Sequence, residues 1–224
     1  MNYDIIVVGA GPCGIFTSME IKKNNPDLKI LMLEKGNSIE KICPKRISKK
    51  CVNCSPCNIT TGFAGAGAYS DGKLSLSPDV GGNLPDYIGY EKTKELIKYV
   101  DNIYLGFGAD EKIYGLNNEE KINCIRKKAI RSNLKLVECP IRHMGTEVGY
   151  NIYGKIQKSL KDMEIEMSFR NPVKDIIVDD NRKIVGVAAD NNYYADNVII
   201  CVGREGSDWL KKLCNKHNIE TETG

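Results

Sequence analysis

The chain has 224 residues, 42% of them hydrophobic, and its 32 basic residues nearly balance its 29 acidic ones. This length is enough to bury a large core, and a net charge of +3 is too small to indicate a nucleic-acid or anionic-membrane partner. No apolar run approaches the roughly 20 residues of a membrane helix, and no secretory signal opens the sequence. We therefore expect a cytoplasmic protein whose nine cysteines are mostly reduced.

The first informative stretch is residues 3–14, where an apolar run ends in Gly9-x-Gly11-x-x-Gly14. Gly9 permits a tight turn out of a strand, Gly11 keeps side chains away from a pyrophosphate, and Gly14 lets the next helix pack closely on the sheet. The N-terminus of that helix offers N–H groups and a positive dipole end to phosphates. The pattern predicts a dinucleotide-binding turn, the alternative being a glycine-rich turn that binds nothing.

A second strand is expected at residues 28–34, another apolar run, and it ends in Glu34. An acidic residue about 20 positions after the glycine motif can accept hydrogen bonds from ribose hydroxyls. Strand, glycines, helix and acid in this order favour a cofactor site far more than the glycines alone do. Glu34 also argues against a 2′-phosphate on the same ribose, although the neighbouring Lys35 tempers this.

Residues 35–90 show little helical periodicity and are rich in Gly, Ser, Pro and Cys, which in a compact domain is typical of a functional loop. Apolar spacing then predicts three amphipathic helices and one short strand that ends at a proline. The helices are expected at 91–105, 118–132 and 147–161, and the strand at 134–139.

The last part of the chain reads as a small β-meander, with strands at 173–178 and 184–189, that leads into an apolar strand at 197–202. This last run suits a central parallel strand. It ends in Gly203-Arg204 before a helix at 208–216, a second strand–glycine–helix junction that can bring a backbone edge beside the cofactor. No repeat or linker divides the chain, so we predict one domain over 1–224, a Rossmann-like α/β FAD/NAD(P)-binding domain with a parallel sheet and a β-meander crossover.

The glycine motif with Pro12, the pair Glu34-Lys35, the meander and Gly203-Arg204 together resemble the glutathione-reductase-type FAD-binding fold. The segment 51–75 is similar to the signature of the poorly characterised FAD-dependent dehydrogenases, formerly described as NAD(FAD)-utilising dehydrogenases. The motifs at 140–147 and 203–210 resemble the same family.

The resemblance implies an FAD-dependent oxidoreductase that transfers hydride between a small organic substrate or NAD(P)H and the flavin. Members of that family are about twice as long, so the chain would correspond to an amino-terminal portion whose FAD site a carboxy-terminal segment or subunit completes. Spacing and resemblance together assign the following residues to the cofactor: Gly9, Gly11, Pro12, Gly14, Glu34, Lys35, Gly65, Ala66, Gly67, Ser70, Asp71, Gly72, Lys73, Gly203 and Arg204.

The glycine-rich loop at 62–73 has few bulky side chains, so its backbone N–H groups can reach an anionic ligand edge. The resemblance implies that this loop lies along the flavin, with Ser70, Asp71 and Lys73 as polar contacts. Lys73 is the candidate for a positive charge that favours the reduced, anionic flavin. The alternative is an Ω-loop in which Lys73 is merely solvated.

Four thiols fall in one short region, Cys51-x-x-Cys54-x-x-Cys57 with Cys43 upstream. Two-residue spacings allow thiolates to converge on an iron–sulfur cluster or a zinc ion. A redox-active disulfide between Cys54 and Cys57, or simple packing, stays open. The other five cysteines lie where cysteine acts as a small hydrophobe, namely Cys13, Cys124, Cys139, Cys201 and Cys214.

Arg142 and His143 stand side by side before a predicted helix, and such a pair can bind an acidic substrate or transfer a proton near neutral pH. A structural hydrogen-bonding histidine is the alternative. For the whole chain two other functions stay open. One is an NAD(P)-binding Rossmann protein, although the long loop and the meander favour FAD over NAD(P). The other is a non-catalytic remnant or subunit that binds no flavin tightly.

Overall fold

The computed structural model describes residues 2–69 and 72–222, so Ser70 and Asp71, two residues assigned to the cofactor, lie outside the described residues. The chain divides into two compact units, the first formed by the segments up to Tyr69 and from Tyr153 onward, the second by Ser70–Ile152. Whether both belong to one FAD-binding domain stays a prediction. No helix in the described part is long and apolar enough to cross a membrane.

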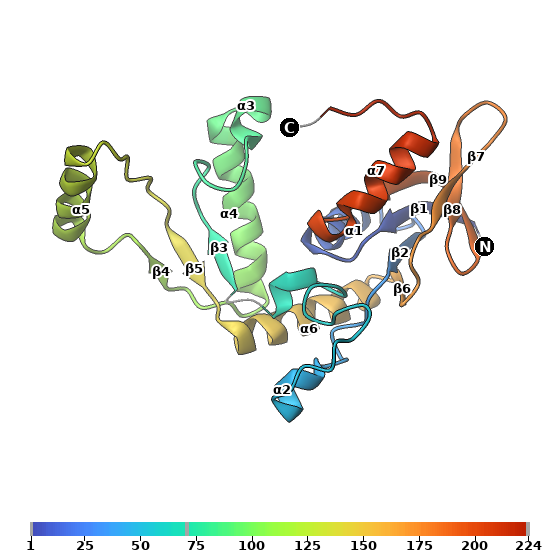
Figure 1. Cartoon of the computed structure of the whole chain (residues 1–224), viewed down its shortest axis with the longest axis horizontal. Helices are drawn as coiled ribbons and strands as arrows, with labels where there is room; N and C mark the ends of the chain where they lie inside the picture. Colours follow the sequence, from blue (N-terminus) through green and yellow to red (C-terminus); the bar gives the residue numbers. More distant parts are fainter. Residues whose placement is uncertain (1, 70–71, 223–224) are drawn as a thin grey trace. The chain divides into compact units, whose positions relative to one another are not determined.

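The first unit contains a six-stranded sheet in the order β6-β2-β1-β9-β8-β7 (Figure 1). Strands β6, β2, β1 and β9 are mutually parallel, while β7, β8 and β9 form an antiparallel meander. The α/β class, the parallel sheet and the meander that leads into a parallel strand are therefore confirmed. The strands are β1 (Asn2–Val8), β2 (Ile30–Glu34), β6 (Glu166–Phe169), β7 (Asp175–Val178), β8 (Ile184–Ala188) and β9 (Asn192–Ile200).

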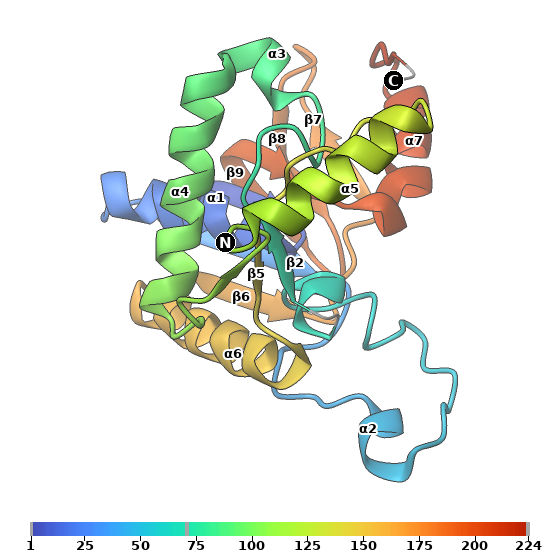
Figure 2. The same cartoon turned by 90° about the vertical axis from the view of Figure 1, so that its left-hand side faces the viewer.

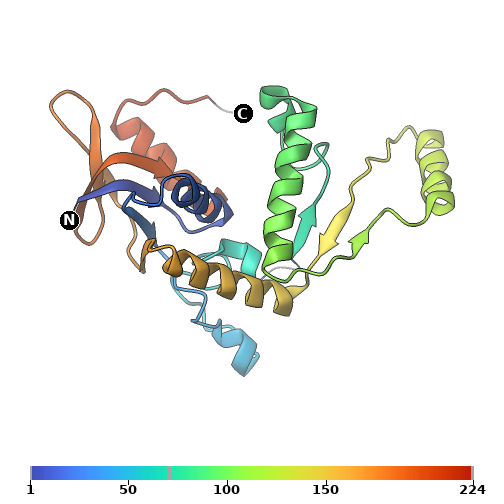
Figure 3. The ribbon, with the colours of Figure 1, turned by 180° about the vertical axis from the view of Figure 1, so that it is seen from behind.

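Helices α1 (Pro12–Asn24) and α7 (Ser207–Lys216) lie against opposite faces of this sheet, α7 in front in Figure 1 and α1 in front in Figure 3. β2 is buried along its whole length, as expected for an inner parallel strand. Alternate strand residues point to opposite faces. Ile6 and Val8 therefore share a core cluster with Leu213 of α7, whereas Val7 lies under the start of α1.

The turn between β1 and α1 is packed as its glycines predict. A Cβ on Gly14 would lie 2.0 Å from the carbonyl oxygen of Gly9 and 3.3 Å from Cγ1 of Val7. Gly9 has φ +104°, and a Cβ there would lie 2.8 Å from the carbonyl oxygen of Cys201, directly after β9. The tight turn and the close helix–sheet approach are both confirmed, and only glycine fits at either position.

The second unit holds a small antiparallel sheet in the order β3-β5-β4 together with helices α3, α4 and α5. In Figure 2 the short α3 leads directly into α4. α6 (Thr146–Asp162) begins in this unit's residue range and ends in that of the first. The elements of the unit are β3 (Lys73–Ser75), α3 (Leu84–Ile88), α4 (Tyr90–Gly106), β4 (Ile113–Tyr114), α5 (Glu119–Arg131) and β5 (Ile141–His143).

The three predicted helices are confirmed as α4, α5 and α6, but the strand predicted at 134–139 is wrong. Leu134 and Val137 are 65% and 43% exposed, so the apolar positions on which that prediction rested have no core to pack against. The strand begins only after Pro140, at Ile141. Among its described residues, the 35–90 loop is irregular apart from β3, α3 and two short helical turns, α2 (Pro44–Ser48) and η1 (Gly65–Ala68).

We expect Asp175 to stabilise the fold in a pH-dependent way, because it joins β7 to the end of α7. Its Oδ1 lies 2.7 Å from Nε2 of His217, and its Oδ2 accepts a hydrogen bond from Lys216. Burial raises the pKa of Asp175, but the hydrogen bonds from Lys216 and His217 outweigh it and leave the pKa below its usual value. This stabilisation is therefore complete above the unfolded-state pKa near 4 and disappears as the pH falls through the lower folded-state value.

Asp175→Asn should lower the free energy of unfolding at pH 7 by about 1 kcal/mol or less, since Lys216 is largely exposed. The difference from the wild type should shrink between pH 4 and pH 2.5. Urea unfolding at several pH values measures it, with the exposed neighbour Asp180→Asn as the matched control. A difference that is the same at pH 7 and pH 2.5 would contradict this assignment.

Candidate dinucleotide-binding site

A cavity of about 710 Å³ opens in the first unit at the carboxyl ends of β1, β2 and β9. The chain leaves β1 toward β2 on one side, while β9 flanks it on the other, and such a switch point is where open α/β sheets bind ligands. Ten of the residues assigned to the cofactor line this cavity: Gly9, Gly11, Pro12, Glu34, Lys35, Gly65, Ala66, Gly67, Gly203 and Arg204.

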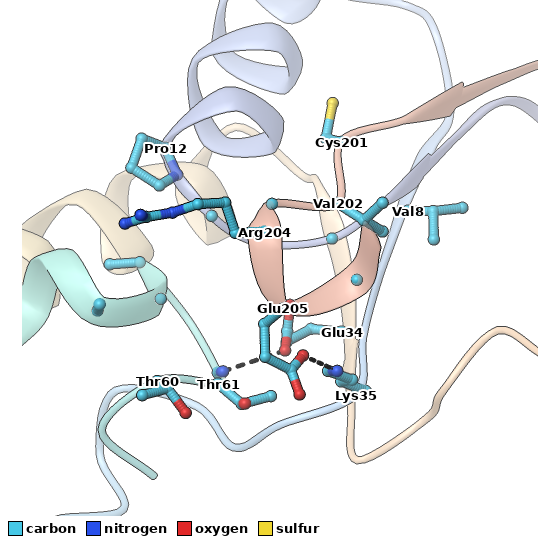
Figure 4. Close-up of a pocket in the computed structure, with 18 of the residues that line it drawn as sticks. Val8, Pro12, Glu34, Lys35, Thr60, Thr61, Cys201, Val202, Arg204 and Glu205 are labelled. Carbon is cyan, nitrogen blue, oxygen red and sulfur yellow. Dashed lines mark hydrogen bonds and ion pairs between the residues drawn. The ribbon is translucent and has the colours of Figure 1, made fainter. Parts of the chain in front are cut away.

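The phosphate-binding part of the prediction corresponds to the start of α1. Gly11 is the N-cap, and no side chain caps the helix there, so the N–H groups of its first turn point to the open end. A Cβ added to Gly11 would meet no protein atom within 4 Å. Arg204 extends toward Pro12 in Figure 4. The helix dipole and the guanidinium together make this end of the cavity positive.

Glu34 organises the wall of the cavity. Its carboxylate accepts hydrogen bonds from the N–H groups of Ala10 at 2.8 Å, Gly36 at 2.8 Å and Gly62 at 3.1 Å. The residue is only 7% exposed. A carboxylate accepts about four hydrogen bonds, so the backbone takes three of these positions and leaves one, on Oε2. The ribose contact predicted for Glu34 stays a prediction, with room for one hydroxyl.

Lys35 forms an ion pair with Glu205 on the rim of the same cavity. Figure 4 shows the Glu205 carboxylate directed toward the Lys35 ammonium group. The carboxylate of Glu205 therefore neutralises the positive charge of Lys35, which reduces the attraction of Lys35 for a phosphate.

Several residues that line the cavity could not be predicted from the glycine motif, because they come from segments far from it. These residues include Thr60, Thr61, Pro172, Val173, Glu205 and Trp209. Glu205 and Trp209 stand beside the Gly203-Arg204 junction that the sequence analysis did recognise, so that junction was the available signal. Thr60 and Thr61 lie within the 51–75 segment that carries the family resemblance, whereas nothing in the local pattern at Pro172 indicated a site.

The remaining cofactor assignments do not line the cavity. Gly14 lies under the turn and acts through packing. Gly72 and Lys73 belong to the second unit, where Lys73 opens β3 and pairs with His143 of β5. The flavin contacts assigned to Ser70, Asp71, Gly72 and Lys73 therefore stay predictions.

Arg142 and His143 form part of β5 in the second unit. The Arg142 guanidinium donates to both carboxylate oxygens of Asp101, at 2.5 and 2.7 Å, and to the carbonyl oxygen of Asp110. The hydrogen bonds with Asp101 raise the pKa of Arg142 above its ordinary value. Arg142 is 2% exposed, so it is engaged within the protein. The His143 ring packs edge-on against Tyr114, with 6.2 Å between ring centroids.

The cysteine cluster is not assembled into a metal centre. Cys43 is buried, Cys51 and Cys57 are exposed, and Cys54 is intermediate, all as free thiols. Over residues 2–69 and 72–222, no three His, Cys, Asp or Glu side chains are grouped so that they could hold a metal ion. The residues as placed thus do not fit the predicted iron–sulfur or zinc site. Backbone hydrogen bonds from Ile59 and Thr60 lower the pKa of the Cys57 thiol.

No protein-family model matches the sequence. No curated protein matches it either. Solved structures do resemble this fold. They include L-proline dehydrogenase from P. horikoshii, with TM-score 0.56, 12% identity, and coverage of 100% of this chain and 57% of that one. L-amino acid deaminase from Proteus vulgaris is another, with TM-score 0.55, 13% identity, and coverage of 98% of this chain and 50% of that one.

A third similar structure is 3-ketosteroid-Δ4-(5α)-dehydrogenase from Rhodococcus jostii RHA1, with TM-score 0.54, 16% identity, and coverage of 90% of this chain and 46% of that one. The chain therefore spans about half the length of the solved structures that it resembles. At these identities the likeness shows the fold alone, which is the Rossmann-like FAD-binding α/β fold.

We expect Glu34→Gln to destabilise the protein, because an amide NH2 cannot accept the backbone N–H groups that the second carboxylate oxygen accepts. One or two buried donors would lose their acceptor, at a cost of about 1–3 kcal/mol. Urea unfolding would report the loss. The control is Glu205→Gln, which makes the same chemical change on the exposed rim of the cavity. Equal stability of the two variants would contradict the role assigned to Glu34.

Proposed function

We propose that the first unit binds FAD in this cavity, and that the chain forms part of an FAD-dependent oxidoreductase. The observation that carries the proposal is the open space at Gly11. There an uncapped helix N-terminus faces the cavity and no protein atom lies within 4 Å of an added Cβ. Uncapped N–H groups at the end of a parallel strand are the feature that a pyrophosphate needs.

The charges along the cavity suit the two halves of an adenosine diphosphate group. The start of α1 and Arg204 supply a positive end for the diphosphate, while Glu34 offers one free acceptor position to a ribose hydroxyl. The cavity is of the size and character of a cofactor site. Gly65, Ala66 and Gly67 add a wall with no long side chains.

FAD is favoured over NADP(H) as the resident cofactor because Lys35 is already paired with Glu205. A 2′-phosphate next to Glu34 and Glu205 would face two carboxylates and only one shared ammonium group. NAD(H) carries no such phosphate, and it is the competing occupant that the experiment below must separate from FAD.

When bound, FAD would supply a ring that accepts or donates hydride, and the protein would orient and tune it. We propose that a small organic substrate or NAD(P)H exchanges hydride with it in the cytoplasm. Residues 1–224 would serve as the amino-terminal part of an FAD-binding domain that a further segment or subunit completes. Lys73, together with Ser70, Asp71 and Gly72, would contact the flavin. His143 is a further candidate for contact with the substrate, whereas Arg142 is engaged by Asp101 and Asp110.

Gly11→Ala tests the site without disturbing the fold. The backbone at Gly11 has φ −74° and ψ 179°, which alanine adopts freely, and the new methyl group meets no protein atom. We expect an unchanged melting temperature and FAD binding that is at least about ten-fold weaker, because the methyl group keeps the diphosphate away from the turn. Flavin absorbance after anaerobic purification and titration with FAD measure the binding.

Gly154→Ala is the matched control, since a Cβ there also meets nothing within 4 Å and the residue lies in α6, outside the cavity lining. Titrations with NAD⁺ and NADP⁺ run in parallel. If Gly11→Ala binds FAD as strongly as the wild type, the diphosphate does not bind at this turn and the proposed site is wrong. Binding of NAD⁺ but not FAD by the wild type would favour the NAD(P)-binding alternative, and binding of neither would favour the non-catalytic one.

A further inference from the structure

Two thiols that the sequence places 188 residues apart meet beside the turn. The Sγ of Cys13 lies 3.4 Å from the Sγ of Cys201. Cys13 is the second residue of α1, and Cys201 directly follows β9. Cys13 is exposed to solvent, whereas Cys201 is only 8% exposed. One residue of the pair is therefore exposed to solvent, and the other is buried.

The backbone fixes both thiols in place. The N–H of Cys201 donates to the carbonyl oxygen of Val8 at 2.8 Å, which continues the pairing of β9 with β1. The close approach of Gly14 to Gly9 holds the first turn of α1 against the end of β1. In Figure 4 the Cys201 sulfur points away from Glu34 and Glu205. The contact between the sulfurs thus follows from the packing of the turn itself.

We propose that Cys13 and Cys201 form a thiol modification site, which a low-molecular-weight disulfide such as oxidised glutathione converts reversibly into an intramolecular disulfide. The two sulfurs, 3.4 Å apart, need to approach by about 1.4 Å to reach the bonding distance of about 2.05 Å. Rotation of the exposed Cys13 side chain can supply most of that movement.

The reaction is a thiol–disulfide exchange in two steps. Cys13 gives its proton to solvent, and its thiolate attacks one sulfur of the small disulfide. The S–S bond of that reagent breaks, a mixed disulfide forms at Cys13, and one small thiolate leaves. Cys201 then gives up its proton, and its sulfur attacks the Cys13 sulfur and expels the second small thiolate. Both leaving thiolates take up protons, so two protein thiols are oxidised and one disulfide is reduced to two thiols.

The surroundings of the two residues set the order of these steps. Burial raises the pKa of the Cys201 thiol to about 12, and the hydrogen bond with Cys13 contributes in the same direction. In the reduced protein Cys201 is therefore protonated, and it gives up its proton only in the second step, when it attacks the mixed disulfide at Cys13. Cys13 is the thiol that meets the reagent first, and Cys201 is the resolving thiol.

The test is disulfide mapping of the whole chain without any nucleotide, so its outcome does not depend on FAD binding. The reduced protein is incubated with oxidised glutathione, digested without reductant and analysed by mass spectrometry. We expect a peptide pair linked through Cys13 and Cys201, at least ten-fold more abundant than any other linked pair and abolished by dithiothreitol. Cys201→Ser should instead retain glutathione on Cys13, and Cys13→Ser should leave Cys201 unmodified.

Cys124→Ser is the matched control, because it removes an exposed thiol from α5 and should leave the linkage unchanged. Circular dichroism establishes that each variant is folded, and the mapping of the wild type requires no variant at all. The proposal is overturned if the wild type keeps glutathione on Cys13 with no linkage to Cys201. It is equally overturned if linked pairs form among other cysteines to the same extent.

Discussion

The buried carboxylate of Glu34 is the interaction on which the candidate site depends. Buried backbone N–H groups must find an acceptor, and at this edge of the sheet three of them converge from the turn after β1, the exit of β2 and the loop before η1. A neutral side chain cannot accept all three with the same strength. This accounts for an acidic residue at the end of a strand that is otherwise apolar and wholly buried.

Close backbone packing is the second constraint, and it has two consequences. Gly9 and Gly14 bring the turn against the end of β9 so tightly that a methyl group at either position would collide with a carbonyl oxygen. The same approach leaves the first turn of α1 open toward the cavity and sets Cys13 against Cys201. The open turn at the start of α1 and the contact between the two thiols therefore have the same structural origin.

The sequence predicted what local patterns determine. The order of strand, glycines, helix and acid predicted β1, α1 and β2 and several residues that line the cavity, and helical spacing predicted α4, α5 and α6. It could not predict contacts between distant segments, such as Gly62 donating to Glu34, Arg142 donating to Asp101 or Cys13 meeting Cys201. At 134–139 the apolar pattern failed because Leu134 and Val137 face solvent rather than a core.

The distribution of charge around the cavity links these constraints to the proposed cofactor. Glu34 accepts three hydrogen bonds from the protein's own backbone, so in the proposed complex it could accept at most one more from a ribose hydroxyl. Lys35 and Glu205 neutralise each other on the rim, which leaves Arg204 and the start of α1 to attract the phosphates. For the proposed cofactor, this balance would favour contacts with the diphosphate over contacts with the ribose. Consequently, a methyl group added at Gly11 should affect binding of the proposed cofactor more specifically than a substitution of Glu34, which would also disturb the protein's own backbone hydrogen bonds.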